Sequence, residues 1–218
     1  KKIIRYSEPN KNVKTLFIWP EGVFSGYNYS DIFIFRDLIK KNFSKNHHII
    51  FGVNKLDKNT GLFYNSLVLV NNEFKIIQHY NKQKLVPFGE FLPFENLLSK
   101  FGLKKITEGY VTFQKDNQQN NIKLEQLSIL PLICYEVIFT RFIQKASDNT
   151  NLIINISEDA WFGNTIGPDQ HYAKSIFRSI ENGTFFLRSA NKGISAIINN
   201  KGIPIKHLNR DEAGNIEL

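Results

Sequence analysis

The sequence predicts an α/β domain whose strands and helices form layers around a mixed β-sheet. Short apolar segments alternate with helical segments in one part of the chain and follow one another as hairpins in another. This mixture favours a sheet with both parallel and antiparallel strands. The chain has 218 residues, 42% of them hydrophobic and 22% charged, which suits one domain with a buried core. Its apolar runs are only a few residues long, far below the roughly 20 residues that a membrane-spanning helix needs.

In the first part of the chain, strand-like segments flank one amphipathic helix. Ser30 is a good N-cap, and the helix is expected to run from it to about Asn42. Its apolar residues share one face: Ile32, Phe35, Leu38, Ile39 and Phe43. The pair Asn71-Asn72 predicts a hairpin turn. Strands are expected over 14–19, 48–53, 63–70 and 74–80.

The second part of the chain predicts further strands with helices between them. Segment 81–103 is expected to be a long connection, because it contains two Pro, two Gly and four Phe. A loop is expected over 163–168, and helices over 137–145 and 171–181. Strands are expected over 127–133, 152–157, 184–190, 193–198 and 203–206, the last two as a hairpin.

The charge of the chain bears on its partners. The net charge of +8 indicates either a solvated basic surface or attraction to a polyanion. The basic residues are scattered and no nucleic-acid-binding motif is present, so an anionic membrane surface is a better candidate than a nucleic acid. The single cysteine, Cys134, excludes an internal disulfide. The five histidines lack metal-ligand spacing, so we expect no metal site; His79, His171 and His207 are interpreted as packing or surface residues.

Cys134 is a candidate nucleophile because of its place in the pattern. It ends an apolar strand and precedes a predicted helix. A thiol at that junction would lie near backbone amides that favour a thiolate and could bind an oxyanion. The alternative is a small core residue, which a lone cysteine in an apolar strand usually is.

Two charged residues also follow apolar strands. Glu21 comes directly after Trp19-Pro20, at the kind of strand end where open α/β folds place active groups. Lys82 follows the strand that ends at Tyr80. The carboxylate could accept the thiol proton, the ammonium could neutralise an oxyanion, and Glu90 could hold that ammonium charged. The alternatives are a surface turn acid for Glu21 and an ordinary solvated lysine for Lys82.

These residues lie in four motifs, which read WPE at 19–21, YNKQKLVPFGE at 80–90, ICYE at 133–136 and DAWFG at 159–163. Together they resemble the Glu-Lys-Cys motifs of the nitrilase superfamily. More narrowly, LVPFGEFLP at 85–93 and the segments 161–171 and 187–193 resemble the nitrilase-like domain of the apolipoprotein N-acyltransferase family. The resemblance runs from about residue 15 to about residue 205, in one order. The family's opening strand motif is not recognisable in residues 1–14.

The resemblance implies a fold and a set of site residues. The fold is an αββα four-layer sandwich with mixed sheets, a single nitrilase-like domain over 1–218, incomplete at both ends and without the family's flanking membrane helices. Glu21 is implied as general base, Lys82 as oxyanion-stabilising cation and Cys134 as nucleophile. Supporting positions are matched by Glu90, Tyr135 and Glu136. Structural roles only are assigned to Trp161, Arg188 and Asn191.

The implied reaction is a ping-pong acyl transfer without metal or organic cofactor. The Cys134 thiolate attacks the sn-1 ester of a phospholipid, typically phosphatidylethanolamine, and a lysophospholipid leaves. The α-amino group of a diacylglyceryl-cysteine at the N-terminus of an apolipoprotein then attacks the thioester and forms an amide. Phospholipid, apolipoprotein and the membrane surface are the implied partners. The implied location is the periplasmic side of a bacterial inner membrane, although this chain alone would be soluble.

The aromatic residues Phe88, Phe91 and Phe94 are interpreted as a mobile flap that shields the acyl chain; the alternative is a loop packed onto the core. Two rival functions stay open. One is a soluble amidase that uses the same triad on a small amide, with water resolving the thioester. The other is a non-catalytic remnant that binds lipid or a partner without turnover. The aromatic segment and the basic charge favour the acyltransferase.

Overall fold

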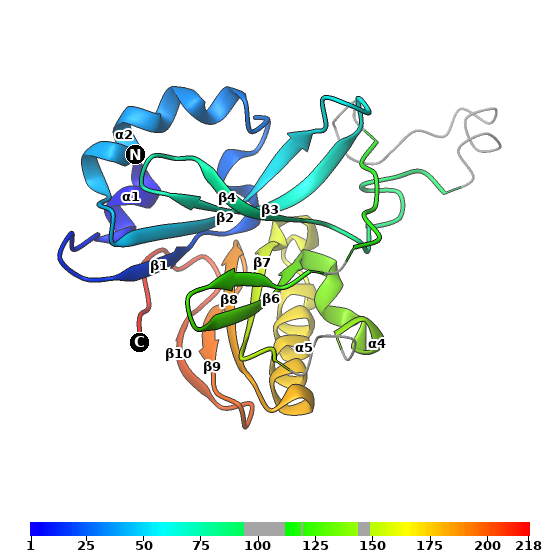
Figure 1. Cartoon of the computed structure of the whole chain (residues 1–218). Coiled ribbons are helices and arrows are strands. Elements are labelled where there is room, and N and C mark those ends of the chain that lie inside the picture. Colours follow the sequence, from blue (N-terminus) through cyan, green and yellow to red (C-terminus); the bar gives the residue numbers. More distant parts are fainter. Residues whose placement is uncertain (94–111, 119, 144–148) are drawn as a thin grey trace.

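The computed structural model has two β-sheets packed face to face with helices on their outer faces (Figure 1). It describes residues 1–93, 112–118, 120–143 and 149–218. One apolar cluster lies between the two sheets and extends under α5, and a second lies between the first sheet and α1 and α2. The order of layers is therefore helix, sheet, sheet, helix, which confirms the αββα sandwich.

The first sheet has the strand order β1-β2-β3-β4. β1 (Thr15–Ile18) is parallel to β2 (His47–Leu56), whereas β3 (Phe63–Asn71) is antiparallel to both β2 and β4 (Ile76–Asn81). β1, β2 and β4 therefore run in the same direction, and their carboxyl ends lie at the same edge of the sheet.

The second sheet has the order β10-β9-β8-β7-β6-β5. Strands β6, β7 and β8 are parallel, β5 pairs antiparallel with β6, β9 pairs antiparallel with β8, and β10 pairs antiparallel with β9. The parallel strands read as nearly continuous apolar runs because both of their faces are covered. The bounds are β5 Ile122–Leu124, β6 Leu127–Ile133, β7 Leu152–Glu158, β8 Phe185–Asn191, β9 Ser195–Ile198 and β10 Pro204–Leu208.

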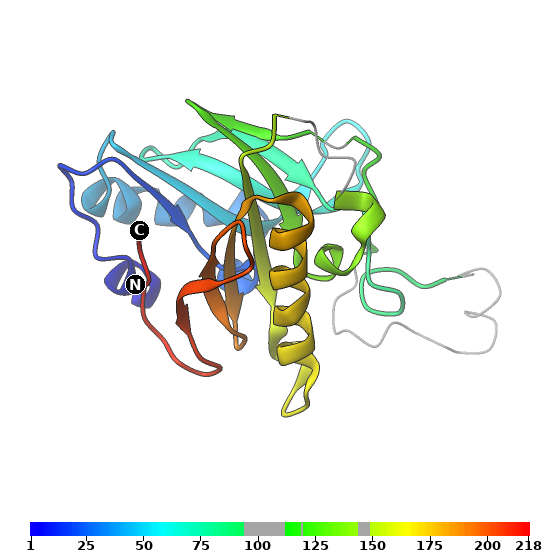
Figure 2. The same cartoon turned by 90° about the horizontal axis from the view of Figure 1, so that it is seen from below.

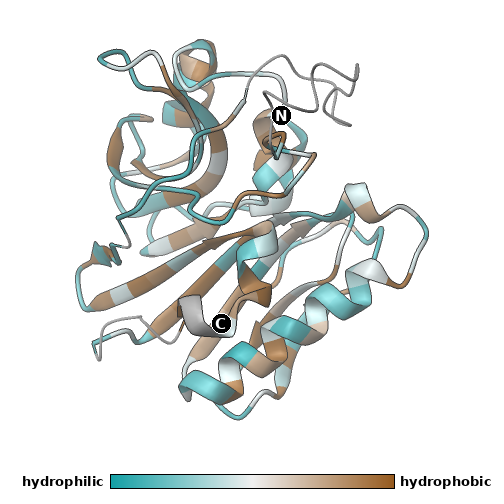
Figure 3. Cartoon of the chain, turned by 90° about the vertical axis from the view of Figure 1, so that its right-hand side faces the viewer, coloured by the Kyte–Doolittle hydropathy of each residue, from teal (hydrophilic) through white to brown (hydrophobic). Residues whose placement is uncertain are grey.

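Helices close both outer faces. α1 (Lys2–Ser7) and α2 (Arg36–Asn42) cover the first sheet, and α5 (Gly167–Asn182) lies against the second sheet on the side away from the first (Figure 2). The predicted apolar face of the first helical segment is confirmed, since Ile32, Ile39 and Phe43 are buried. Figure 3 shows the hydrophobic residues concentrated on the strands and α5 striped with hydrophobic and hydrophilic positions. No helix of the described ranges is long and apolar enough to cross a bilayer.

Most predicted strands are confirmed, whereas the helices differ in kind and in bounds. The segment expected as one helix from Ser30 begins as the 3₁₀ helix η2 (Asp31–Phe35), and the Ser30 hydroxyl donates to Asp31 rather than capping the helix. α5 begins at Gly167, before the predicted start, because Pro168 fits the first turn of a helix. The short elements α1 and β5 were not predicted. The predicted helix over 137–145 is instead the 3₁₀ helix η4 (Cys134–Ile138) followed by α4 (Thr140–Ile143), and 144–148 lie outside the described residues.

Candidate active site

Three sequence-predicted site residues lie just beyond the carboxyl ends of strands in the two sheets. Glu21 begins the 3₁₀ helix η1 (Glu21–Phe24) and is the third residue after β1, whereas Lys82 directly follows β4 and Cys134 directly follows β6. The Glu21 backbone passes close to Gly52 in β2. A Cβ at position 52 would lie 2.8 Å from the Glu21 carbonyl oxygen, so this close approach requires glycine. The structure thus brings the three side chains to one end of the two sheets.

Lys82 is the buried cation of this site. Its side chain is 1% exposed, and its Nζ lies 3.0 Å from Glu90 Oε1 and 3.9 Å from Glu21 Oε1. Burial by itself lowers the pKa of Lys82, but the Glu90 and Glu21 carboxylates outweigh that effect and raise the pKa. The ammonium is therefore charged at any physiological pH and held between two carboxylates.

Asn65, the third residue of β3, connects the two carboxylates. Its Nδ2 group donates to Glu21 Oε1 at 2.8 Å and to Glu90 Oε1 at 2.7 Å. Glu90 is also fixed by its other oxygen, which accepts from the backbone N–H of Val86 at 2.8 Å. The Asn65 amide and the Lys82 ammonium thus each lie close to both carboxylates, those of Glu21 and Glu90.

Glu21 has the environment of a base. Its Oε2 accepts from the backbone N–H of Glu158 in the second sheet at 3.0 Å. Burial raises the pKa of Glu21; the Lys82 charge opposes this and the Glu90 charge adds to it. A carboxylate whose pKa lies above its ordinary value accepts a proton more readily than an exposed one.

Cys134 is the first residue of η4 and directly follows β6, in a strained backbone conformation. Its φ of 48° lies in the left-handed region, which non-glycine residues rarely adopt. The residue is 9% exposed. Burial and the Glu21 carboxylate raise the pKa of the Cys134 thiol to about 12, although the Lys82 ammonium lowers it. The resting thiol is therefore protonated and needs a base at the moment of attack.

Glu136 fixes the loop after Lys82 to the turn that carries Cys134. Its Oε1 accepts from the Tyr80 hydroxyl and from the backbone N–H groups of Gln83 and Lys84, at 2.7–3.0 Å. Its Oε2 accepts from the N–H of Ile133 at 2.8 Å. Burial raises the pKa of Glu136 to about 6, although the backbone donors and Lys82 favour the charged form.

The aromatic candidates are only partly placed. Tyr135 is half-buried, with its ring edge-on to Phe139. Phe88 is 43% exposed, Phe91 is half-buried, and Phe94 lies outside the described residues. The mobile flap therefore stays a prediction. Trp161 is 68% exposed, so its indole does not pack into the core.

Two motif residues assigned structural roles make polar contacts close to the site. Asn191 Nδ2 donates to Glu158 Oε2 at 2.6 Å. Arg188 is buried and pairs with Asp159 at 2.6 Å between Nη2 and Oδ2. His171 is buried as well, and it contacts Asp159 and the Cys134 backbone.

Sequence reasoning did not select Asn65, Asp159 or His171 as site residues. Asn65 carried a usable signal, because a polar side chain in a strand that continues into the apolar run 67–70 needs a hydrogen-bond partner when it is buried. Asp159 follows β7 in the same way as Cys134 follows β6. His171 gave no such signal, since its contacts come from residues 12 and 37 positions away.

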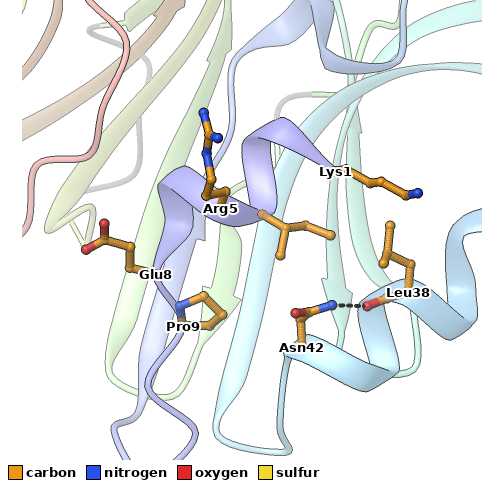
Figure 4. A pocket seen from close by; sticks show the side chains of 7 residues that line it. Lys1, Arg5, Glu8, Pro9, Leu38 and Asn42 are labelled. Carbon is orange, nitrogen blue, oxygen red and sulfur yellow. Dashed lines mark hydrogen bonds between the residues drawn. The ribbon is translucent and has the colours of Figure 1, made fainter.

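A surface hollow of about 390 Å³ lies elsewhere, between α1 and α2 (Figure 4). Lys1, Arg5, Leu38 and Asn42 are among its lining residues, and none of the candidate site residues is. Among the residues that the structure describes, no group of three or more His, Cys, Asp or Glu side chains is arranged to hold a metal ion.

Curated relatives share substantial sequence with the chain. It is 40% identical over 156 residues to an apolipoprotein N-acyltransferase of Rhizobium leguminosarum bv. trifolii, which covers 71% of this chain and 29% of that protein. It is 39% identical over 155 residues to the apolipoprotein N-acyltransferase of Rickettsia prowazekii, covering 71% of this chain and 31% of that protein. The match therefore spans about a third or less of the length of these relatives.

Solved structures share the fold at low sequence identity. Nit3 of Saccharomyces cerevisiae, a member of the nitrilase superfamily, matches with a TM-score of 0.63 and 17% identity over 91% of this chain and 74% of that one. An amidase from Nesterenkonia sp. AN1 matches with a TM-score of 0.66 and 16% identity over 96% of this chain and 78% of that one. The family model for carbon-nitrogen hydrolases matches residues 6–217. The chain therefore belongs to the carbon-nitrogen hydrolase family.

Proposed function

We propose that the chain is the catalytic domain of an apolipoprotein N-acyltransferase, with Cys134 as nucleophile. The observation that carries the proposal is the buried Lys82 ammonium between Glu21 and Glu90, at the same strand ends as the only thiol of the chain. Base, cation and nucleophile are the three groups that acyl transfer through a thioester requires. The relatives that are named apolipoprotein N-acyltransferases support an apolipoprotein as the acyl acceptor, and the proposal takes a phospholipid as the acyl donor.

In the first half-reaction, Glu21 accepts the Cys134 proton as the sulfur attacks the carbonyl carbon of the sn-1 ester. The Lys82 ammonium stabilises the oxyanion of the tetrahedral intermediate. When the intermediate collapses, the ester C–O bond breaks and Glu21 returns the proton to the leaving alkoxide. A lysophospholipid and a thioester on Cys134 result.

In the second half-reaction, the α-amino group of the acceptor attacks the thioester carbonyl. Glu21 accepts a proton from the nitrogen, Lys82 again stabilises the oxyanion, and the C–S bond breaks. The proton returns to the sulfur, so the site is regenerated and the acceptor carries an amide. Glu90 keeps Lys82 in place and charged. Glu136 holds the backbone that follows Lys82 and the backbone that precedes Cys134.

The proposal is tested by mass spectrometry of the protein after incubation with phosphatidylethanolamine vesicles. We expect one fatty acyl group on the peptide that contains Cys134, removable by hydroxylamine as thioesters are. Cys134→Ala should carry no adduct. A wild-type protein without adduct, or an adduct that persists in Cys134→Ala, would contradict the proposal.

The amidase function has one observation in its favour, because the fold is shared with amidases such as that of Nesterenkonia sp. AN1. The two functions differ in what resolves the thioester, an amine or water. Release of ammonia from small aliphatic amides, at a rate that phospholipid vesicles do not reduce and with no fatty acyl adduct, would favour the amidase.

Replacing Asn65 by aspartate should shift the pH dependence of thioester formation. The change places a third carboxyl between Glu21 and Glu90, where Nδ2 now donates to both. Loss of that donor and added negative charge raise the pKa of Glu21 further. Because Glu21 must be ionised to act as base, the acid limb should move up by about one pH unit, with a roughly tenfold lower rate at pH values on that limb. An unmoved limb, or an equal shift in the remote variant Asn42→Asp, would contradict the role of Asn65.

A further inference from the structure

We propose that His171 on α5 is a positioning residue for the nucleophile. Its Nε2–H group holds the carbonyl of Cys134, and this contact fixes the direction of the peptide group between Cys134 and Tyr135. The inference rests on the proposed function only in taking Cys134 as the nucleophile.

The contact itself determines which nitrogen of His171 carries hydrogen. His171 is 4% exposed, and its Nε2 lies 3.1 Å from the Cys134 carbonyl oxygen. A carbonyl oxygen only accepts hydrogen bonds, so Nε2 must be the donor. The accepted bond acts on the residue whose backbone is in the rare left-handed conformation, where surrounding contacts are needed to keep it.

The other ring nitrogen is held as well. Nδ1 lies 2.9 Å from Asp159 Oδ1 and 3.1 Å from Arg188 Nη2. Contacts at both ring nitrogens fix the plane of the imidazole, and with it the position of Nε2 against the Cys134 carbonyl.

A buried network holds the imidazole. The Asp159 and Arg188 side chains are fully buried and pair at 2.6 Å. Burial raises the pKa of Asp159, but the hydrogen bond from His171 and the charge of Arg188 outweigh it and lower the pKa to about 2. Arg188 also donates to Asn155, whose Nδ2 donates to the Leu132 carbonyl at 3.3 Å. The network therefore ties α5 to β6, β7 and β8 directly beneath the Cys134 turn.

The direction of this peptide group matters for an oxyanion. The described residues include no cis peptide bond, so the N–H of Tyr135 points opposite to the carbonyl of Cys134. At sharp turns that carry a nucleophile, the N–H of the following residue commonly stabilises the oxyanion. A carbonyl held toward His171 keeps that N–H on the opposite side. A rotated peptide group would instead present a carbonyl oxygen to the developing negative charge.

The test compares two reactions of the same thiol. The first is the burst of p-nitrophenolate from p-nitrophenyl butyrate, which forms an oxyanion. The second is alkylation of Cys134 by iodoacetamide, which forms none. His171→Gln keeps a donor with the reach of Nε2, whereas His171→Asn keeps a group near Asp159 but cannot reach the Cys134 carbonyl. His47→Phe is the matched control, since buried His47 contacts the Asn10 carbonyl at 2.9 Å and pairs with the start of β1, opposite the site.

We expect the burst rate per folded molecule to fall about 100-fold in His171→Asn, with alkylation changed by no more than a few-fold, and to recover largely in His171→Gln. His47→Phe should lower the melting temperature and leave both rates unchanged. Equal burst rates in wild type and His171→Asn, or equal losses in burst and alkylation, would overturn the positioning role alone. A wild-type burst that survives Cys134→Ala would overturn the proposed nucleophile and this inference with it.

Discussion

Replacing Lys82 by methionine is expected to lower the rate of thioester formation by at least about 10³-fold and to destabilise the fold by about 3 kcal/mol at pH 7. The methionine fills a similar volume, so the loss is that of a charge. Glu21 and Glu90 would then share one Asn65 donor without a cation, and breaking a buried ion pair by removing one partner is costly. The oxyanion would lose its stabilising ammonium as well.

The stability loss in Lys82→Met should depend on pH with a defined sign. Without Lys82, the pKa of Glu21 rises further, because the charge that lowers it is gone. Folding of the variant is therefore coupled to protonation of Glu21 over a wider pH range than folding of the wild type. Its loss of stability relative to the wild type should shrink as pH falls through the raised pKa of Glu21. Protonated Glu21 also cannot act as the base, which compounds the loss of rate at neutral pH.

Urea unfolding at pH 5 and pH 7, together with the rate of thioester formation, would check both parts. Lys75→Met is the matched control, since Lys75 is exposed and its Nζ lies 3.6 Å from Glu73 in a surface ion pair, which is worth little. A Lys82→Met variant that keeps wild-type rate would show that the buried ammonium serves the fold only.

The sequence located the strand-end residues but not the groups that connect them. Glu21, Lys82 and Cys134 became candidates because each follows a strand-like segment, and the resemblance of their motifs to the nitrilase superfamily assigned their roles. Asn65 lies inside β3 rather than after its end, and its importance arises from the pairing of β3 with β2 and β4, which local sequence does not reveal. The hydrogen bond from the Glu158 N–H to Glu21 joins the two sheets between residues 137 positions apart, which local sequence does not reveal either.

The helices were less predictable than the strands for a physical reason. Apolar periodicity marks the buried face of a helix, and it did so for the segment containing Ile32 and Ile39. It does not separate a 3₁₀ turn from an α-helix, because both bury residues three apart. The segment after Cys134 became a 3₁₀ helix since Glu136 is drawn back to accept from the Ile133 N–H, a contact that helical periodicity cannot show.

Glu136→Ala is expected to cause a large loss of both stability and the rate of thioester formation. Four donors converge on this carboxylate: the Tyr80 hydroxyl and the N–H groups of Gln83, Lys84 and Ile133. Leaving buried donors unpaired costs about 1–3 kcal/mol each, so stability should fall by at least about 3 kcal/mol. The loop after Lys82 and the turn at Cys134 would both relax, and the rate of thioester formation should fall by about 10²–10³-fold.

Glu136→Gln separates the shape of the side chain from its charge. A glutamine can accept from the three donors at Oε1, but its amide group then faces the Ile133 N–H, donor against donor. The pKa of Glu136 is about 6, so this carboxylate gains a proton below pH 6 and adds its own loss of rate to the one caused by protonation of Glu21. In Glu136→Gln the acid limb of the pH–rate profile should reflect Glu21 alone and be less steep, with a lower rate at every pH.

Glu73→Gln is the control on the surface and should retain the wild-type pH–rate profile. A Glu136→Ala protein with a near wild-type rate would show that Lys82 and Cys134 hold their relative position without the shared carboxylate.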